Sequence, residues 1–518
     1  MKGAARCTTG TSASAAPYSG SAGIALRPDR AAAPPSIFAH RLQPTAWQCT
    51  ILCKPTRGAA CTWLPVSRQV QNLPVGSRMP GRRCAPSSNG CGAILCSRFG
   101  VSNNKELRTM RRRLLSVTSG TSCLLAVVLL ASQAAGQWPG WRGPNRDGKS
   151  LDTGLLKQWP EGGPKLLWKV EDIGVGFSSA TVCDGKVFIS GDQDGKLMLF
   201  AFDVDGKLLW KAEHGKGRGG PDGSRSSPVF DNGKLYLVNG HGLIGCFDAV
   251  NGKLLWSHAA KEFGGSPGGW GYAESVLIYK NMAIYKPGGK NCIVAFDKQS
   301  GEVIWKSSGF EAGPEYSSCI LVEFEGQPMI VTGTNRGIVA VDAETGKLLW
   351  SNDWSAGNVA NCPTPAYADG YVFWSNGYGK GGICLKLRKT DGKVSAETAW
   401  TTKELVCHHG GYIIHEGHIY GNHEGGWACL DLKTGQRKWF QRAVGKGSLC
   451  FADGMLYLYA ERNGVCALAT CSPEGLEIKG QVTVKGNGPS WAHPVVAGGR
   501  LYLRYDTNLY CFDVKNAP

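Results

Sequence analysis

Five side chains of different chemical types stand at equivalent positions of a repeated sequence unit. They are Arg225, Glu274, His409, Lys446 and Trp491, each just before the first strand expected in its unit. Arg and Lys can hold an anion, Trp can stack on a ring, and Glu or His can accept a proton. A structural position would repeat one residue type, so this variation indicates a ligand site, the alternative being a merely solvated surface. The complete set of candidate ligand-binding residues is Arg225, Glu274, His408, His409, Lys446, Trp491 and His493.

Five histidines lie close together in CHHGGYIIHEGHIYGNHEGG, residues 407–426. His415 and His418 flank an expected hairpin turn, so we expect them to point away from His408 and His409. The H-E-G-H sequence differs from the H-E-x-x-H helix motif of zinc proteases. We therefore predict no metal site, with a metal bound by this cluster as the alternative.

The elements that must position these residues come from a motif in which Asp, Gly and Trp recur. Its clearest copies are FDVDGKLLW (202–210), FDAVNGKLLW (247–256), FDKQSGEVIW (296–305), VDAETGKLLW (341–350) and LDLKTGQRKW (430–439). The repeat interval averages about 44 residues, the length of a four-stranded propeller blade. We expect the Asp to bond backbone N–H groups of the turn and the Trp to pack between sheets. These structural residues are Trp168, Trp210, Trp256, Trp305, Trp350, Trp400, Trp439, Asp203, Asp248, Asp297, Asp342, Asp431 and Asp513.

The second unit shows four expected strands separated by tight turns. They are SSPVF (226–230), GKLYLVNG (233–240), GLIGCFDA (242–249) and GKLLWSH (252–258). Apolar and polar residues alternate between Asn-Gly type turns, which is typical of antiparallel hairpins. One such unit cannot bury its own faces, whereas eight stacked around an axis can. In the degenerate seventh unit, we place the Asp position at Ala467 and the Trp position near Ile478.

The last unit lacks its outer strand, and the missing piece stands at the other end of the repeats. FDVKNAP ends the chain at Pro518, while PKLLW (164–168) matches the end of the motif without a preceding Phe-Asp. The sequence therefore predicts an all-β, eight-bladed β-propeller over residues 164–518, closed by the N-terminal strand pairing into the last blade. A solenoid is the alternative. The ring of residues expected at the channel mouth is Phe177, Arg225, Glu274, Ser318, Cys362, His409, Lys446 and Trp491.

The net charge of +17 belongs mainly to the front of the chain, because residues 1–113 hold 17 basic and 2 acidic side chains. The repeats therefore show no sign of a nucleic-acid surface. Residues 110–136 combine three arginines, a short apolar run and small residues at a cleavage position, the layout of a secretory signal peptide. We expect 1–109 to be unstructured or a gene-model extension, and 137–163 to form an N-terminal arm. We expect export to the periplasm or the exterior.

Cysteines of the repeats recur at one position, close to the Asp of the motif. They include Cys246, Cys384, Cys429, Cys466 and Cys511. Equivalent sites on packed sheets lie about 10 Å apart, whereas a disulfide needs Cα atoms closer than about 7 Å. We predict buried free thiols.

The repeats resemble the pyrroloquinoline-quinone (PQQ)-type β-propeller repeat, whose core reads A-x-D-x-x-T-G-x-x-x-W, and VDAETGKLLW is close to it. WPGWRGPNRDG (138–148) and WAHPVVAGGRLYLR (491–504) resemble secreted PQQ-like propellers of planctomycete-type bacteria. The wider family includes quinoprotein alcohol dehydrogenases and the propeller lipoprotein of outer-membrane assembly. The vicinal Cys-Cys pair that quinoprotein dehydrogenases carry beside the quinone does not occur in this sequence.

Two functions follow as hypotheses. The first is a secreted, non-catalytic propeller that binds a small molecule or an envelope protein at its mouth, as a monomer without a membrane span in the mature chain. The second, implied by the resemblance, is a PQQ-dependent alcohol or sugar dehydrogenase in which Glu274 or His409 takes the substrate proton. An assembly scaffold is a third possibility.

Overall fold

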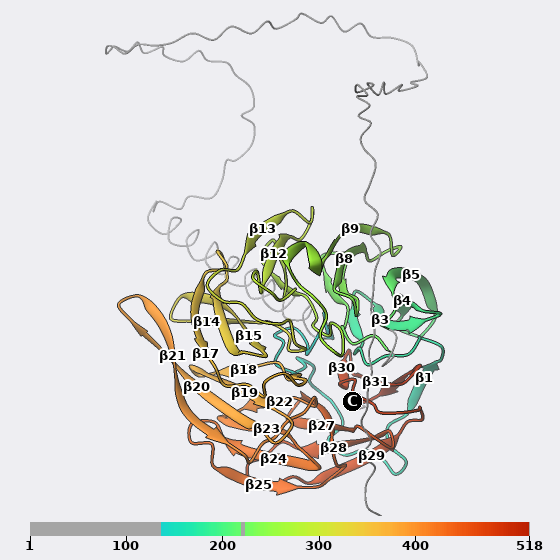
Figure 1. Ribbon diagram of the computed structural model, residues 1–518. Helices are drawn as coiled ribbons and strands as arrows, with labels where there is room; N and C mark the ends of the chain where they lie inside the picture. Colours follow the sequence, from blue (N-terminus) through green and yellow to red (C-terminus); the bar gives the residue numbers. More distant parts are fainter. Residues whose placement is uncertain (1–135, 219–222, 517–518) are drawn as a thin grey trace, which may run out of the picture. The chain divides into compact units, whose positions relative to one another are not determined.

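The computed structural model describes residues 136–218 and 223–516 (Figure 1). The expected extension 1–109 and, except for Gly136, the expected signal peptide 110–136 lie outside the described residues. Within the described ranges, no helix has the length and hydrophobicity needed to cross a membrane.

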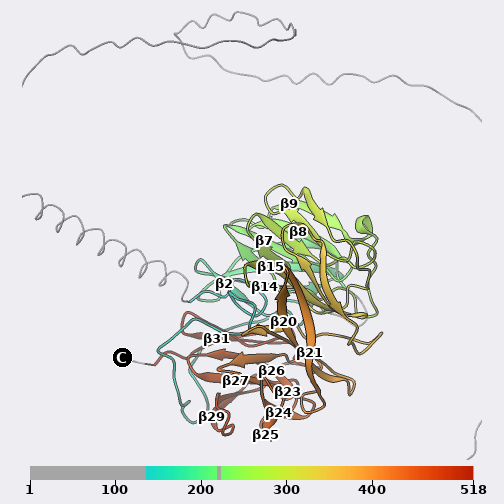
Figure 2. The same cartoon turned by 90° about the vertical axis from the view of Figure 1, so that its left-hand side faces the viewer.

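The fold is an eight-bladed β-propeller of four-stranded antiparallel sheets, as the repeat predicts (Figures 1 and 2). Blades 1 and 2 are β2 (Thr181–Cys183), β3 (Lys186–Gln193), β4 (Lys196–Asp203), β5 (Leu208–Lys216), and β6 (Val229–Asp231), β7 (Lys234–Val238), β8 (Leu243–Asp248), β9 (Leu254–Ala259). Blades 3 and 4 are β10 (Leu277–Tyr279), β11 (Met282–Tyr285), β12 (Val294–Asp297), β13 (Val303–Lys306), and β14 (Ile320–Phe324), β15 (Gln327–Thr334), β16 (Gly337–Asp342), β17 (Leu348–Asn352). A short 3-10 helix, η1 (Ala260–Phe263), follows β9.

The second half of the chain repeats this pattern. Blades 5 and 6 are β18 (Ala366–Ala368), β19 (Tyr371–Asn376), β20 (Gly381–Thr390), β21 (Lys393–Thr402), and β22 (Tyr412–His415), β23 (His418–His423), β24 (Gly426–Asp431), β25 (Arg437–Gln441). Blades 7 and 8 are β26 (Gly447–Ala452), β27 (Met455–Ala460), β28 (Val465–Thr470), β29 (Ile478–Thr483), and β30 (Val495–Ala497), β31 (Arg500–Tyr505), β32 (Asn508–Asp513), completed by β1 (Leu166–Val170).

The ring closes between the two ends of the repeats. β1 pairs antiparallel with β32, placing Leu166 opposite Phe512 and Val170 opposite Leu509. The first strand is thus the outer strand of blade 8, as predicted. This pairing gives blade 8 its fourth strand and joins the two ends of the repeats.

The repeated Trp and Asp have the structural roles expected of them. The indole Nε1 of Trp168 in blade 8 donates a 2.8 Å hydrogen bond to the carbonyl of Val204 in the next blade. Gly206 of the same turn has φ +83°, and a Cβ there would lie 2.8 Å from the Trp168 ring. Asp203 Oδ1 accepts the N–H of Lys207 at 2.9 Å. The motif therefore holds its own turn with Asp and ties neighbouring blades together with Trp and Gly.

Blade 7 departs from the predicted register. Thr470, rather than Ala467, takes the Asp position, since its N–H bonds the carbonyl of Glu477 at 2.9 Å. The strand pairing places Gly480 at the Trp position. Trp159 of the N-terminal arm packs over this glycine, where a Cβ would lie 2.5 Å from the Cβ of Trp159. The arm thus supplies the indole that the seventh unit lacks.

The N-terminal arm also crosses the propeller axis. Its contacts reach blades on several sides of the ring, through Trp138 with Val182, Pro139 with Phe230, Arg146 with Val276, Arg142 with Tyr412, Gly148 with Phe451 and Leu156 with Val514. Arg142 and Arg146 are buried, and burial lowers the pKa of both. Their guanidinium groups donate to backbone carbonyls, which satisfies charges taken out of water. The arm is therefore an integral part of the fold.

Apolar side chains fill the interfaces between blades, and the cysteines lie among them. Phe188 of blade 1 and Leu235 of blade 2, for example, belong to one buried cluster. Every cysteine of the described ranges is a free thiol, and all but Cys362 and Cys471 are buried. The prediction of unbridged thiols in the repeats is confirmed for these residues.

Candidate ligand-binding site at the channel mouth

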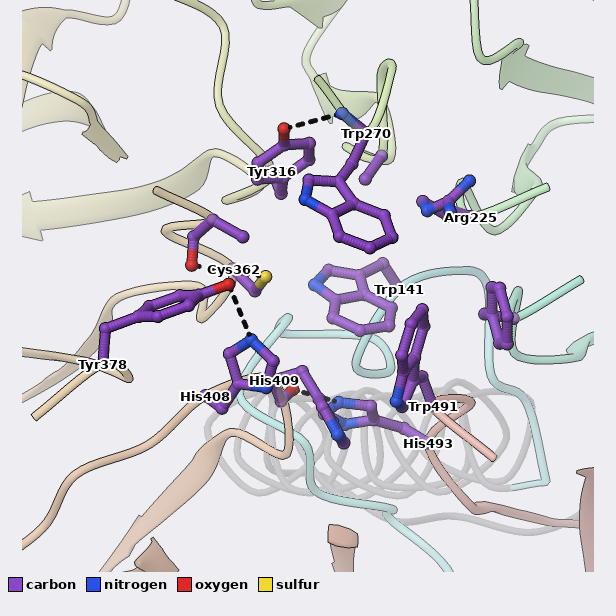
Figure 3. Close-up of a pocket in the computed structure, with 13 residues that line it drawn as sticks. Trp141, Arg225, Trp270, Tyr316, Cys362, Tyr378, His408, His409, Trp491 and His493 are labelled. Carbon is purple, nitrogen blue, oxygen red and sulfur yellow. Dashed lines mark hydrogen bonds between the residues drawn. The ribbon is translucent and has the colours of Figure 1, made fainter. Parts of the chain in front are cut away.

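A cavity of about 160 Å³ lies among the segments that lead into the inner strands of the blades (Figure 3). We call it the mouth cavity. Nine of its lining residues carry an aromatic or imidazole ring, namely Trp141, Phe177, Trp270, Tyr316, Tyr378, His408, His409, Trp491 and His493. The other lining residues are Arg225, Ala273, Ala360 and Cys362. The site is therefore apolar and ring-rich, with one guanidinium among the described lining residues.

Most of the predicted ligand-binding residues meet at this cavity. Arg225, His408, His409, Trp491 and His493 line it. Predicted ring members Phe177 and Cys362 also line it. Lys446 instead lines an adjoining recess, together with His408 and Tyr378.

Glu274 and Ser318 do not line the mouth cavity, and their expected places are taken by Ala273 and Tyr316. A shift of one residue in an extended segment turns the side chain to the other face, which accounts for Glu274. Ser318 lies two residues deeper, where its Oγ accepts the N–H of Ser275 at 3.0 Å. Ser318 thus belongs to a buried hydrogen-bonded belt between inner strands.

Glu274 occupies a closed environment beside the cavity. It is 2% exposed, and Oε1 accepts the backbone N–H of Lys286. Oε2 has no hydrogen-bond partner among the described residues. Burial raises the pKa of Glu274 to about 7, and the nearby Lys286 and Arg146 charges oppose that rise. A neutral carboxyl at this depth is consistent with the high cost of burying an unpaired charge.

Glu461, which the sequence analysis missed, organises the polar side of the mouth. The Trp491 indole Nε1 donates to Glu461 Oε1 at 2.8 Å, and Lys446 Nζ lies 3.1 Å from Oε2. His409 Nε2 lies 3.5 Å from Oε1. Glu461 follows β27 in a loop that carries no part of the repeated motif, so its role depends on contacts between blades.

His408 links this polar group to the aromatic wall. Its Nδ1 accepts a 2.9 Å hydrogen bond from Lys446 Nζ, and its Nε2 lies 3.2 Å from the Tyr378 hydroxyl. An ammonium can only donate, so Nδ1 is unprotonated and a neutral ring carries its hydrogen on Nε2. Burial, followed by the Lys446 charge, lowers the His408 pKa. Burial also holds the pKa of His409 well below its usual range.

Arg225 lies on the opposite side of the mouth, beside two rings (Figure 3). Its guanidinium carbon is 5.5 Å from the centroid of Phe177 and 5.9 Å from that of Trp270. Nη1 donates to the carbonyl of Gly223 at 2.7 Å. Burial lowers the Arg225 pKa, and the nearby Arg218 charge acts in the same direction. The rings hold the guanidinium at the cavity wall through cation–π contacts.

Trp141 forms part of the cavity from the arm side. Its Nε1 donates to Thr364 Oγ1 at 2.9 Å, and its ring lies 4.6 Å from that of His493. The sequence contained WPGWRG, but nothing in it indicated that the arm would cross the axis. Trp141 is partly buried and contacts residues that lead into the inner strands of blades 5 and 8, so the arm completes the site.

The remaining histidines of residues 407–426 do not join the cavity. His415 and His418 face each other across the β22–β23 turn, and the His415 ring packs 4.3 Å from Phe451. His423 Nδ1 accepts the N–H of Val406 at 2.9 Å. No group of three His, Cys, Asp or Glu residues within 136–218 and 223–516 is arranged to hold a metal ion.

The family model described as outer membrane protein assembly factor BamB matches residues 163–307 and 195–441. Among solved structures, BamB from Moraxella catarrhalis is similar at 16% identity and a TM-score of 0.50, covering 68% of this chain and 98% of that chain. The quinohemoprotein alcohol dehydrogenase ADHIIG from Pseudomonas putida HK5 is similar at 12% identity and a TM-score of 0.52, covering 76% and 82%.

At these identities, the structural likeness concerns the fold. No curated protein matches the chain in sequence. The family match covers more than half of the chain, and it agrees with the repeat and with the eight blades. The protein therefore belongs to the PQQ-like β-propeller family represented by the outer membrane protein assembly factor BamB.

Proposed function

We propose that this protein is a non-catalytic binding module that takes a small planar ring into the mouth cavity. The observation that carries the proposal is the cavity itself, about 160 Å³ and lined by nine rings. A cavity of about 150 Å³ with apolar walls is large enough to hold benzene. Aromatic walls favour a flat ligand, because rings gain from offset or edge-to-face contacts with it.

The state of the titratable groups supports binding without catalysis. Burial lowers the pKa of His493 to about 3, and the pKa values of His408 and His409 are also lowered. Glu274 has no surface in the cavity, and Glu461 bonds the Trp491 indole. No described lining residue is a carboxylate, and the lowered pKa values of the three lining histidines make them weak acceptors for a substrate proton.

The residues that line the mouth cavity do not fit PQQ, the cofactor that a quinoprotein dehydrogenase would bind. A cation held beside such a quinone needs oxygen ligands, usually carboxylates, and the described lining contains none. Cys362 is the single cysteine of the described lining, so the vicinal pair is lacking. We therefore assign no reaction to this site.

We further propose that the ligand is met outside the cytoplasm. The support is the sequence of residues 110–136, with its arginines, apolar run and small residues. Mass spectrometry of the native protein tests this proposal. We expect a mature N-terminus at Gln137, and peptides from residues 1–109 would contradict it.

Calorimetric titration with phenol tests the binding function. We expect saturable binding to the wild type, and loss of binding in Ala273→Phe, which fills the cavity with its own ring. Ala399→Phe is the matched control, because Ala399 is exposed on β21 and distant in the chain from the lining residues. Equal binding by Ala273→Phe and the wild type would refute the proposed site.

A further inference from the structure

Tyr378 presents a hydroxyl group to the mouth cavity from an unusual backbone conformation. It lies in the turn between β19 and β20 and has φ +57°, in the left-handed region that favours glycine. Among the described residues, it is the only aromatic one with a positive φ. Figure 3 shows its side chain reaching toward the cavity, with the hydroxyl at the inner end. A bulky residue held in this conformation indicates that its side chain has a function there.

The hydrogen bonds behind Tyr378 run in one direction, toward the cavity. Lys446 Nζ lies 3.1 Å from Glu461 Oε2 and donates to His408 Nδ1 at 2.9 Å. His408 therefore carries its hydrogen on Nε2, which lies 3.2 Å from the Tyr378 hydroxyl oxygen. Because that oxygen accepts the hydrogen of His408, the hydrogen of the hydroxyl itself points elsewhere. The Tyr378 hydroxyl is thus a donor whose direction is set by His408.

This donor has no acceptor within residues 136–218 and 223–516. Burial raises the pKa of Tyr378, so the hydroxyl keeps its hydrogen at neutral pH. The described lining of the cavity also contains no carboxylate that could compete for the hydrogen. A ligand that enters the cavity takes the place of water at this hydroxyl, and it loses affinity unless it supplies an acceptor in return.

The cations near the mouth have partners of opposite charge within the protein. Glu461 pairs with Lys446, and the Asp192 carboxylate attracts the Arg225 guanidinium. A ligand charge buried among the rings of the lining would carry a high cost in free energy, whereas a neutral acceptor that is hydrogen-bonded carries little. A neutral oxygen acceptor therefore suits the site better than an ion.

We propose that the mouth cavity selects an uncharged aromatic carbonyl compound, with its ring among the aromatic side chains and its carbonyl oxygen bonded by the Tyr378 hydroxyl. This inference rests on the proposed ring-binding function and adds the polar group of the ligand. A carbonyl conjugated to a ring lies in the plane of that ring, so a flat ligand can meet the walls and the donor together. Lys446 and His408 are positioning residues, because they fix the direction of the donor.

Acetophenone and α-methylstyrene test the proposal, because they have nearly the same shape and differ in a carbonyl against a vinylidene group. In Tyr378→Phe, which removes only the hydroxyl, we expect the affinity for acetophenone to fall about fivefold in calorimetric titration. The affinity for α-methylstyrene does not fall. Tyr371→Phe is the matched control, since Tyr371 lies in β19 and does not line the cavity, and it leaves both affinities unchanged.

Infrared spectroscopy of bound acetophenone tests the direction of the hydrogen bonds. We expect a lower carbonyl stretching frequency in the wild type than in Tyr378→Phe, because a hydrogen bond weakens the carbonyl bond. In Lys446→Met, His408 can carry its hydrogen on Nδ1 and accept from Tyr378 at Nε2. The carbonyl frequency then rises toward that in Tyr378→Phe. An unchanged frequency in Lys446→Met would overturn the positioning role of Lys446.

The outcomes separate the two levels of the proposal. If Tyr378→Phe changes the affinities for both compounds equally, or changes neither, the carbonyl assignment is overturned and ring binding stands. Tyr316 also brings a hydroxyl to the cavity. A loss of acetophenone affinity in Tyr316→Phe but not in Tyr378→Phe would therefore overturn the assignment to Tyr378. If acetophenone, α-methylstyrene and phenol all fail to bind the wild type, ring binding fails as well.

Discussion

The indole N–H of Trp491 and the carboxylate of Glu461 form a 2.8 Å hydrogen bond that fixes one wall of the mouth cavity. The Trp491 ring in turn lies 4.4 Å from the ring of Phe177. An indole whose N–H is bonded in this way has a defined orientation toward a ligand, so Glu461 is a positioning residue.

Replacing Glu461 should weaken ligand binding without direct contact to the ligand. In Glu461→Ala, the indole N–H loses its acceptor, and we expect phenol affinity to fall by about tenfold, the effect of about 1.4 kcal/mol. Glu461→Gln is the control, since its amide oxygen still accepts from Trp491. Calorimetric titration measures both. Equal loss in the two variants would show that the charge, rather than the acceptor, matters.

Removing Trp159 should destabilise the whole propeller. Trp159 is 2% exposed and takes the place of the indole missing from blade 7. We expect Trp159→Ala to lower the free energy of unfolding by about 3–5 kcal/mol, as for other buried Trp residues. Trp270→Ala provides the comparison, because Trp270 is 40% exposed. Denaturant unfolding measures the difference, and similar small losses in both variants would contradict the proposed role of the arm.

Glu274 should make stability depend on pH in a defined direction. Its pKa is raised from 4.5 to about 7 in the fold, so the folded state holds the proton more tightly than the unfolded chain. Its contribution to stability is complete below pH 4.5 and is lost as the pH rises to about 7. The full difference amounts to about 3 kcal/mol.

The variant Glu274→Gln isolates this effect. We expect its stability relative to the wild type to rise between pH 4.5 and pH 7 and then to level off. Taking the difference from the wild type removes the opposite contribution of His493, whose stabilising effect is lost as the pH falls from 6.5 toward about 3. Denaturant unfolding at several pH values provides the measurement, and a pH-independent difference would refute the raised pKa.

The thiols of the core should resist alkylation in the native state. Burial raises the pKa of Cys407 to about 12, and only the thiolate reacts. We expect iodoacetamide to leave Cys407 unmodified in the folded protein and to modify it in guanidinium chloride, as mapped by mass spectrometry. Rapid modification of Cys407 in native protein would contradict the packing described above.

The repeat predicted the architecture because each unit carries its own turn and its own indole. The turn and the indole both depend on residues close together in sequence. The repeat interval therefore predicted the number of blades, and the split last unit predicted that the first strand completes the last blade. The register of blade 7 was not predicted correctly, because Gly480 stands at the Trp position and the Trp159 indole that packs over it lies far away in sequence. The position of Thr470 became evident only from strand pairing.

The candidate site was predicted in part for a related reason. Arg225 and Trp491 stand at positions set by the hairpins, and counting along the repeat found them. The repeat spacing placed Glu274 one residue away from the lining position. In an extended segment, a shift of one residue turns the side chain to the opposite face. Trp141 and Glu461 reach the mouth through the path of the arm and a loop between strands. These contacts join different blades, so they cannot be predicted from the sequence of any single repeat unit.

The pairing of Leu166 with Phe512 has a consequence for how the protein is made. A contact between such distant residues forms late, after the intervening chain has been synthesised. Until then the nascent protein is an open arc with an unpaired edge at each end, and such edges are templates for another chain. Two molecules that meet at this stage can exchange their first strands and become trapped as a swapped pair. Slow dilution during refolding should therefore favour single rings over such pairs.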